Sequence, residues 1–334
     1  MKRYSKILLF VLLSALSVLI AHLLPFLLIP PDRKAVAQVI EIPRGMPFNQ
    51  VANVLFEKEI IKDKPRFHLL AKLLGATTRI QAGEYEFSAS MLPSQVLNKL
   101  VQGLTKTYTA VIPEGYNIQQ IAPLLASLGL INQDTFLAKT RDPALLSDLG
   151  IEGESLEGYL FPATYILTRG PSEEEIIRKM VDKFHQVYTP ELEQRAKELE
   201  LSRKNVITMA SIIEKETSVI EEMPLISAVF YNRLKKRMRL ESDPTVIYGL
   251  KNFDGNLRKR DLRAWSPYNT YRNFGLPPGP IANPGKDAIM AALYPAKVPY
   301  LYFVSRNNGT HLFSSSYKEH NRAVWEYQKR RRRN

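Results

Sequence analysis

The stretch at 206–217, VITMASIIEKET, carries residue types suited to acid–base chemistry. Met209, Ile212 and Ile213 lie seven, four and three positions before Glu216, so a helix places them in one apolar stripe that ends at this carboxylate. Desolvation beside such a stripe disfavours the charged form and raises the pKa, so that the acid keeps its proton near neutral pH. The spacing therefore predicts that Glu216 is a general acid.

Glu214 is a second carboxylate in the same turn, about 200° around the helix from Glu216. Two glutamates and a lysine at a helix end more often form a solvated polar face. The pattern alone does not distinguish a general acid from a solvated polar face, so the rest of the sequence is needed to choose between them.

The segment at 241–284 is rich in proline and glycine and predicts a rigid, irregular backbone of the kind that carries binding groups. Its polar side chains suit hydrogen bonds to sugar hydroxyls or an N-acetyl amide. The candidate substrate-binding residues are Asp243, Thr245, Tyr268 and Asn269, with Asn232 on the helix predicted at 224–240. Turn or capping roles remain an alternative for each loop residue.

The composition argues against metals, cofactors and nucleic acid. The chain has no cysteine, and its five histidines form no H-x-x-x-H or H-E-x-x-H grouping, so we predict no metal and no cofactor. The net charge of +13 suits nucleic acid, an anionic membrane surface or an anionic polymer. Nucleic acid is disfavoured because no binding module is recognisable and the chain has an export topology.

That topology comes from residues 7–29, which are 23 residues without a formal charge, long enough to span a bilayer of about 30 Å. Lys2, Arg3 and Lys6 precede the span and predict a cytoplasmic tail at 1–6 with the rest of the chain outside. A cleaved signal peptide is the alternative, with an A-x-A site at 35–37. We favour an uncleaved anchor, because signal peptides usually have apolar runs of only about 7–15 residues.

The remaining chain predicts an α+β protein. A βααβ unit with a trailing helix is expected from strands at 36–42 and 83–87 and helices at 48–57, 65–74 and 93–101. Its opening recurs 70 residues later, where Pro113 and Gly115 correspond to Pro43 and Gly45, and a boundary is expected at 103–108. Beyond it we expect further helices, including one over 136–149, and a hairpin of 300–305 with 311–314.

Aromatic side chains mark the stretch at 154–167. Tyr159, Phe161 and Tyr165 fit either a stacking platform for sugar rings or a core strand. The sequence does not decide between these two interpretations.

Several motifs along the chain resemble those of the endolytic murein transglycosylases, the MltG/YceG-like family of bacterial cell-wall enzymes. The matching stretches are EGYLFPATY (157–165), MASIIEKET (209–217), VFYNRL (229–234), SDPTVIYG (242–249), YNTY (268–271), GLPPGPI (275–281), YLYFV (300–304) and HN (320–321). The resemblance covers about residues 36–328 and implies a transmembrane anchor at 7–29, a LysM-like subdomain at 36–105 and a YceG-like catalytic domain at 107–328. The run of lysine and arginine that begins at Lys329 predicts a basic tail at 329–334. It places the catalytic glutamate at Glu216. Ala163 and Glu241 depart from the pattern and leave subsite roles near them open.

The resemblance implies cleavage of the MurNAc-β-1,4-GlcNAc bond within nascent peptidoglycan strands, without water, leaving 1,6-anhydroMurNAc ends and terminating glycan elongation. It places the enzyme at the outer face of the cytoplasmic membrane, with peptidoglycan synthases as candidate partners. One rival is a muramidase-type hydrolase, which needs a second carboxylate such as Asp243 or Glu214 about 5 Å or about 6.5–9.5 Å away. The other is a non-catalytic, membrane-tethered scaffold that binds glycan.

Overall fold

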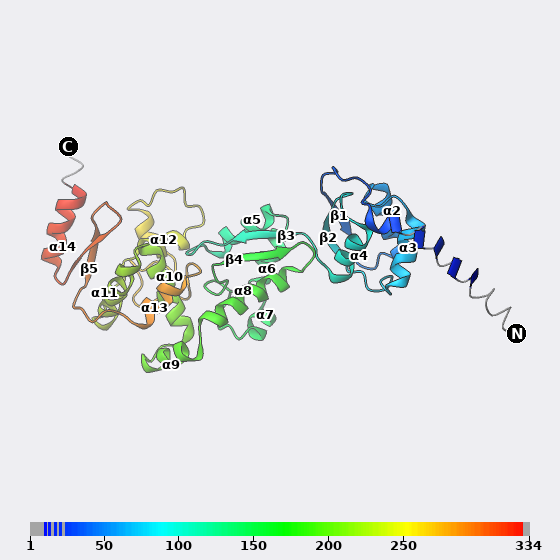
Figure 1. Cartoon of the computed structure of the whole chain (residues 1–334). Coiled ribbons are helices and arrows are strands. Elements are labelled where there is room, and N and C mark those ends of the chain that lie inside the picture. Colours follow the sequence, from blue (N-terminus) through cyan, green and yellow to red (C-terminus); the bar gives the residue numbers. More distant parts are fainter. Residues whose placement is uncertain (1–9, 12, 15–16, 19, 22–23, 330–334) are drawn as a thin grey trace. The chain divides into compact units, whose positions relative to one another are not determined.

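The computed structural model describes residues 10–329 except 12, 15–16, 19 and 22–23, and it confirms a mixed α+β protein (Figure 1). The chain divides into two compact units, the first formed by residues 1–108 with 166–171 and the second by 109–165 with 172–334. The strands of the described residues pair into three two-stranded sheets.

The first unit contains the predicted βααβ arrangement and trailing helix. Its elements are β1 (Gln38–Ile42), α2 (Phe48–Glu57), α3 (Lys64–Leu73), β2 (Gly83–Phe87) and α4 (Pro93–Gln102). β1 and β2 are antiparallel with Ile40 opposite Tyr85, and both of these side chains are buried. The helices cover this hairpin with buried apolar residues such as Leu55 and Phe67, so the unit has its own hydrophobic core.

The predicted membrane span at 7–29 lies partly outside the described residues. No helix within the part of the chain that the structure describes is both long enough and apolar enough to cross a bilayer. Phe26, at the end of the predicted span, is buried in the core of the first unit.

The predicted recurrence of the strand–turn–helix opening is confirmed in its local geometry. Gly45 and Gly115 both have positive φ, +78° and +72°. The amide of Met46 donates to Pro43 O at 3.3 Å, and that of Tyr116 donates to Pro113 O at 3.4 Å. The second copy continues through β3 (Thr107–Val111), α5 (Ile118–Ser127), α6 (Gln133–Lys139), α7 (Pro143–Asp148), β4 (Thr164–Thr168) and α8 (Glu173–Val187), and β3 pairs with β4 in a two-stranded sheet.

Two predictions for the second unit are wrong in detail. The single helix expected over 136–149 is two helices, because Asp142 caps a new helix that begins at Pro143. The loop expected from 241 contains helix α12 (Asp243–Gly249), in which proline occupies the first turn, where the missing amide costs no hydrogen bond.

The rest of the second unit is mainly helical, and α10 packs against α11 and α13. The remaining helices and strands are α9 (Pro190–Glu198), α10 (Arg203–Glu216), α11 (Met223–Lys235), α13 (Lys286–Leu293), β5 (Tyr302–Ser305), β6 (His311–Ser314) and α14 (Tyr317–Val324), with short 3₁₀ helices η1 (Ile220–Glu222) and η2 (Asp261–Arg263) and a π-helix η3 (Trp325–Lys329). β5 and β6 form the predicted antiparallel hairpin.

The aromatic stretch that leads into β4 belongs to the core. Tyr159, Phe161 and Tyr165 are all buried, and the Tyr165 hydroxyl donates to Phe161 O at 2.6 Å. The interpretation as an exposed platform for sugar rings is therefore wrong, and the core interpretation holds.

Candidate active site

Glu216 is the last residue of α10, and the predicted apolar stripe leads to it. Met209, Ile212 and Ile213 are each at most 1% exposed. The helix ends here because Thr217 adopts an extended conformation, with φ −150° and ψ 146°. The Glu216 side chain is partly exposed, so a largely buried helix delivers a carboxyl group to the protein surface.

The pKa of Glu216 is raised to about 7, chiefly because burial disfavours the carboxylate. Ser242 opposes this effect, since its Oγ donates a 2.5 Å hydrogen bond to Glu216 Oε1. The nearby charge of Asp243 raises the pKa further, and that of Arg233 lowers it. The balance leaves a group that exchanges a proton near neutral pH, which suits a residue that acts first as an acid and then as a base.

Ser242 is the N-cap residue of α12, yet its hydroxyl bonds Glu216 and makes no capping bond. Two buried threonines fix its backbone. Thr245 Oγ1 donates to Ser242 O at 2.7 Å, and Thr270 Oγ1 accepts from the Ser242 amide at 3.0 Å. The start of α12 is thereby held in a fixed position against the end of α10.

Asp243 is exposed at the first position of α12 and accepts a 2.7 Å hydrogen bond from the Tyr271 hydroxyl. Burial, and then the hydrogen bond to Asp243 and its charge, raise the pKa of Tyr271 far above its usual range, so the phenol stays neutral and remains a donor. Asp243 thus presents a negative charge near Glu216 while one of its oxygens is fixed by Tyr271.

Arg233, on α11, is 8% exposed and organises the chain that leads to Ser242. Its Nη1 donates to Arg239 O at 3.1 Å, Leu240 O at 2.9 Å and Glu241 Oε2 at 3.2 Å. Its Nε donates to Leu301 O at 2.7 Å. The guanidinium therefore joins α11 to two later segments and contributes positive charge near the carboxyl group.

The last turn of α10 is bonded to three separate segments of the second unit. Glu214 Oε2 accepts from the Gly285 amide at 3.0 Å, at the N-terminus of α13. Lys215 Nζ donates to Gly115 O at 3.1 Å, and Glu216 bonds Ser242. Glu214 is thus occupied with capping α13, on a different side of the helix from Glu216.

The other predicted binding residues make contacts within the fold. Asn232 Nδ2 donates to Val298 O and Tyr300 O at 2.8 and 2.9 Å, and Asn269 Nδ2 donates to Leu262 O and Ala264 O at 3.1 and 2.8 Å. Thr245 is buried beside Ser242. Half-buried Tyr268 packs against Tyr248 with a ring-centroid distance of 4.8 Å. These contacts give Asn232, Thr245 and Asn269 positioning roles and leave Asp243 as the predicted polar group most open to solvent.

Sequence reasoning did not assign roles to Ser242, Tyr271 and Arg233. All three lie in the conspicuous motifs SDPTVIYG, YNTY and VFYNRL. A serine before Asp-Pro predicts a helix cap, and only the folded chain reveals that its hydroxyl bonds a carboxyl group instead.

Glu157 is a second carboxyl group with a strongly perturbed environment. Burial raises its pKa to about 7, and it is 4% exposed. It accepts hydrogen bonds from the Ile118 amide at 3.2 and 3.3 Å, the Tyr248 hydroxyl at 3.1 Å and Asn283 Nδ2 at 3.1 Å. Because it is enclosed and fully engaged, Glu157 ties α5, α12 and the proline-rich loop together and does not reach a substrate.

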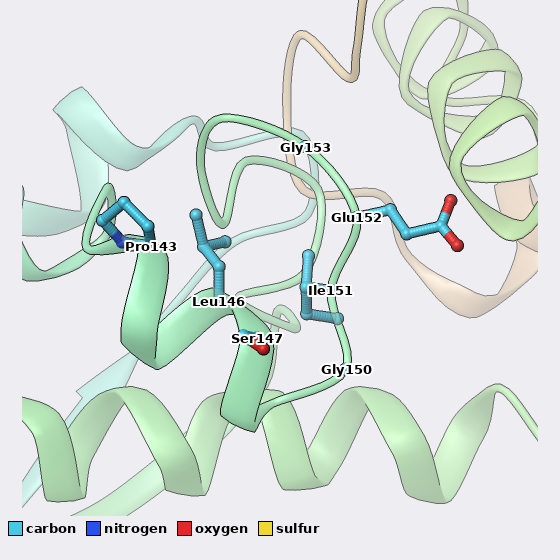
Figure 2. A pocket seen from close by; sticks show the side chains of 7 residues that line it. All are labelled: Pro143, Leu146, Ser147, Gly150, Ile151, Glu152 and Gly153. Carbon is cyan, nitrogen blue, oxygen red and sulfur yellow. The ribbon is translucent and has the colours of Figure 1, made fainter.

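A pocket of about 430 Å³ lies elsewhere, along α7 and the turn after it (Figure 2). Pro143, Leu146 and Ile151 contribute to its lining, and the Glu152 carboxylate points away from Leu146 (Figure 2). None of the residues around Glu216 lines it, so we do not assign the chemistry to this pocket. Among the described residues, no group of three or more His, Cys, Asp or Glu side chains is arranged to hold a metal ion.

The profile of the YceG-like family matches residues 40–326, which is most of the chain. The chain belongs to the YceG-like family. Its mixed α+β fold is also found in a crystal structure of a putative yceG-like protein from Listeria monocytogenes, with a TM-score of 0.60 and 35% sequence identity over 87% of this chain and all of that one.

Two relatives of this YceG-like chain have names that state an activity. The endolytic murein transglycosylase of Bacillus subtilis (strain 168) is 36% identical over 304 residues, which cover 86% of this chain and 84% of that protein. The endolytic murein transglycosylase of Streptococcus pneumoniae serotype 2 (strain D39) is 31% identical over 90% of this chain, which spans 60% of that longer protein.

Proposed function

We propose that this YceG-like chain is an endolytic lytic transglycosylase that cleaves the MurNAc-β-1,4-GlcNAc bond within nascent peptidoglycan strands. The observation that carries the proposal is Glu216, a partly exposed carboxyl group with a pKa raised to about 7 at the end of a buried helix. The names of the relatives from Bacillus subtilis and Streptococcus pneumoniae support the same activity.

In the proposed reaction, protonated Glu216 gives its proton to the glycosidic oxygen as the bond to C1 breaks. The resulting carboxylate then takes the proton of the muramoyl C6 hydroxyl, whose oxygen bonds C1 and closes the 1,6-anhydro ring. The leaving strand gains the proton that Glu216 gives, and Glu216 regains one from the hydroxyl. The hydrogen bond from Ser242 stabilises the carboxylate between the two steps.

The same carboxyl group serves both steps because the nucleophile belongs to the substrate, whereas hydrolysis requires a second carboxylate. Glu214 is bonded to the start of α13, and Asp243 is bonded to Tyr271. Asp243 is the only plausible partner for the hydrolytic rival among the residues around Glu216 described above. We assign Asp243 and Tyr268 to substrate contact, and Asn232, Thr245 and Asn269 to shaping the site.

The test is mass spectrometry of glycan strands incubated with the full chain in detergent, beside its Glu216→Gln variant. Anhydromuramoyl ends from the wild type, with at least a hundredfold less from Glu216→Gln, are the expected result, because general acid–base catalysis contributes about 10²–10⁴-fold. Reducing ends would show that water is the nucleophile. Equal activity of the two proteins would remove Glu216 from the mechanism and leave the scaffold alternative.

The cellular setting is part of the same proposal. Residues 7–29 form a single-pass anchor with residues 1–6 in the cytoplasm, residues 36–105 a LysM-like subdomain, residues 107–328 the catalytic domain and residues 329–334 a basic tail. The enzyme then acts outside the cytoplasmic membrane, on strands still close to the membrane-bound synthases that make them. Labelling of single cysteines introduced at Ser5 and Ser315 with a membrane-impermeant reagent tests the topology, since only the second should react in intact cells.

A further inference from the structure

An exposed surface of arginine and aromatic side chains adjoins the candidate active site. It is formed by Arg239, Arg263, Trp265, Arg272 and Phe274, and we call it the arginine–aromatic surface. The Trp265 and Phe274 side chains are 80% and 64% exposed. A tryptophan exposed to this degree suggests a binding role, because burial of its side chain would remove a large apolar area from water.

Three contacts hold the surface together. The Arg239 guanidinium lies 4.8 Å from the centroid of the Phe274 ring. Arg272 Nη1 donates to Arg263 O at 2.8 Å, and Asn273 Nδ2 donates to Ser266 O at 2.8 Å, next to Trp265. Residues from two segments, 239 and 263–274, therefore lie beside one another.

The surface is continuous with the residues around Glu216. Arg239 precedes Ser242 by three positions and Phe274 follows Tyr271 by three. The Glu241 amide donates to Thr270 O at 3.2 Å, which joins the two segments at the site itself. A polymer that passes over Glu216 therefore has this surface within reach.

The charge of the surface is not balanced locally. The acidic residues of the stretch at 239–274 all have partners: Glu241 pairs with Arg233, Asp254 with Arg258, Asp261 with Arg260, and Asp243 accepts from Tyr271. Within the described chain, Arg239, Arg263 and Arg272 take part in no ion pair between side chains. The surface therefore presents three guanidinium groups that fit anionic groups of a ligand.

We propose that the arginine–aromatic surface is a substrate-binding subsite, in which Trp265 stacks on a sugar ring of the glycan strand and the arginines bind carboxylates of its stem peptides. This inference rests on the proposed function. Trp265 suits the apolar face of a pyranose, and guanidinium groups bind carboxylates in a bidentate manner. An anionic lipid surface is less well matched, because the exposed rings are single and bordered by arginines instead of forming a broad apolar face.

The binding experiment uses the two tryptophans of the chain, Trp265 and Trp325. The full-length Glu216→Gln protein with Trp325→Phe reports on Trp265 alone and does not turn over. We expect strands that carry stem peptides to shift and quench its fluorescence. The matched control, Glu216→Gln with Trp265→Phe, keeps Trp325 and should show no change on adding the same strands.

The arginines are tested by replacing Arg239, Arg263 and Arg272 together with glutamine in the fluorescent protein. Because three exposed ion pairs with the stem peptides would be lost, we expect the Kd for peptide-bearing strands to rise about tenfold. Strands stripped of their peptides by an amidase should bind both proteins equally. In the active enzyme the same triple substitution should raise KM by a larger factor than it lowers kcat.

Two results would overturn the inference. One is a Kd for peptide-bearing strands that the triple substitution does not change. The other is a Trp265 signal that responds to vesicles containing anionic phospholipid and not to strands, which would identify a membrane-binding surface. Both measurements are made without turnover, so a failure of the proposed reaction is distinguishable: it would appear as absent anhydromuramoyl ends while strand binding persists.

Discussion

Ser242 Oγ donates a 2.5 Å hydrogen bond to Glu216 Oε1. This bond joins the N-cap residue of α12 to the last residue of α10. This bond favours the charged form of a carboxyl group whose pKa burial raises to about 7. The Ser242 hydrogen bond lowers the pKa of Glu216 and the charge of Asp243 raises it, and each of these two effects can be removed by one substitution.

Replacing Ser242 with alanine should weaken the acid further. A hydrogen bond to a charged group contributes about 1.5–3 kcal/mol, so we expect the alkaline limb of the kcat/KM profile to move to higher pH by about one to two units. We also expect kcat to fall about tenfold, because the intermediate carboxylate loses its donor. Ser242→Thr keeps a hydroxyl and should retain the wild-type profile; an unchanged profile in Ser242→Ala would show that this bond does not set the pKa.

Replacing Asp243 with asparagine should have the opposite effect on the acid. The negative charge of Asp243 raises the pKa of Glu216, so its removal should move the alkaline limb to lower pH and reduce the rate at pH 7 a fewfold. Tyr271→Phe is the control, because it removes the hydrogen bond to Asp243 and keeps the charge. Complete loss of activity in Asp243→Asn, together with reducing ends in the wild type, would favour hydrolysis.

Glu157 should make the second unit less stable at alkaline pH. Its pKa is raised from 4.5 to about 7, so between these values the folded chain binds a proton that the unfolded chain has released. The stabilisation is complete below about pH 4.5 and is lost as pH rises through 7, by about 3 kcal/mol at most.

Chemical denaturation at pH 5 and pH 8 tests this dependence. The parent for the comparison is Glu216→Gln, because Glu216 titrates in the same range. Adding Glu157→Gln should lower the free energy of unfolding at pH 5 more than at pH 8, so that the difference between the two pH values shrinks. An undiminished difference would mean that Glu157 is not protonated in the folded protein.

Gly158 should tolerate alanine poorly. A Cβ at this position would lie 2.6 Å from Pro280 and 2.8 Å from Ile207 Cγ2, in a backbone with φ +91°. Gly170 is the matched control, with φ +112° and no atom within 4 Å of the added carbon. Both substitutions incur backbone strain of about 1 kcal/mol, and overpacking should add about 1–3 kcal/mol at Gly158 alone. Equal melting temperatures for the two variants would contradict this account of the packing around α10.

Local patterns predicted the parts of this protein that depend on neighbouring residues. The stripe ending at Glu216 was predictable because helical periodicity determines which side chains share a face. The recurrent turns at Gly45 and Gly115 were predictable because both combine proline and glycine at the same spacing.

Relationships across the chain were not predictable in the same way. Tyr271 reaches Asp243 over 28 positions, and Asn283 reaches Glu157 over 126. Asn232 and Asn269 have side chains suited to sugars, and only the folded chain shows that backbone carbonyls take up their donors. Side-chain chemistry alone does not distinguish a group that binds a ligand from one that satisfies the fold.

The three bonds made by the last turn of α10 also bear on when the enzyme becomes active. They span 71, 100 and 26 positions of the chain, and contacts over such separations cost more chain entropy and form later than local helical ones. Until these distant segments assemble, Glu216 is an ordinary solvated carboxylate, ionised at neutral pH. In the proposed mechanism, a nascent or partly folded chain therefore lacks a competent acid, and the capacity to cut a glycan strand arises only when the second unit has completed its folding.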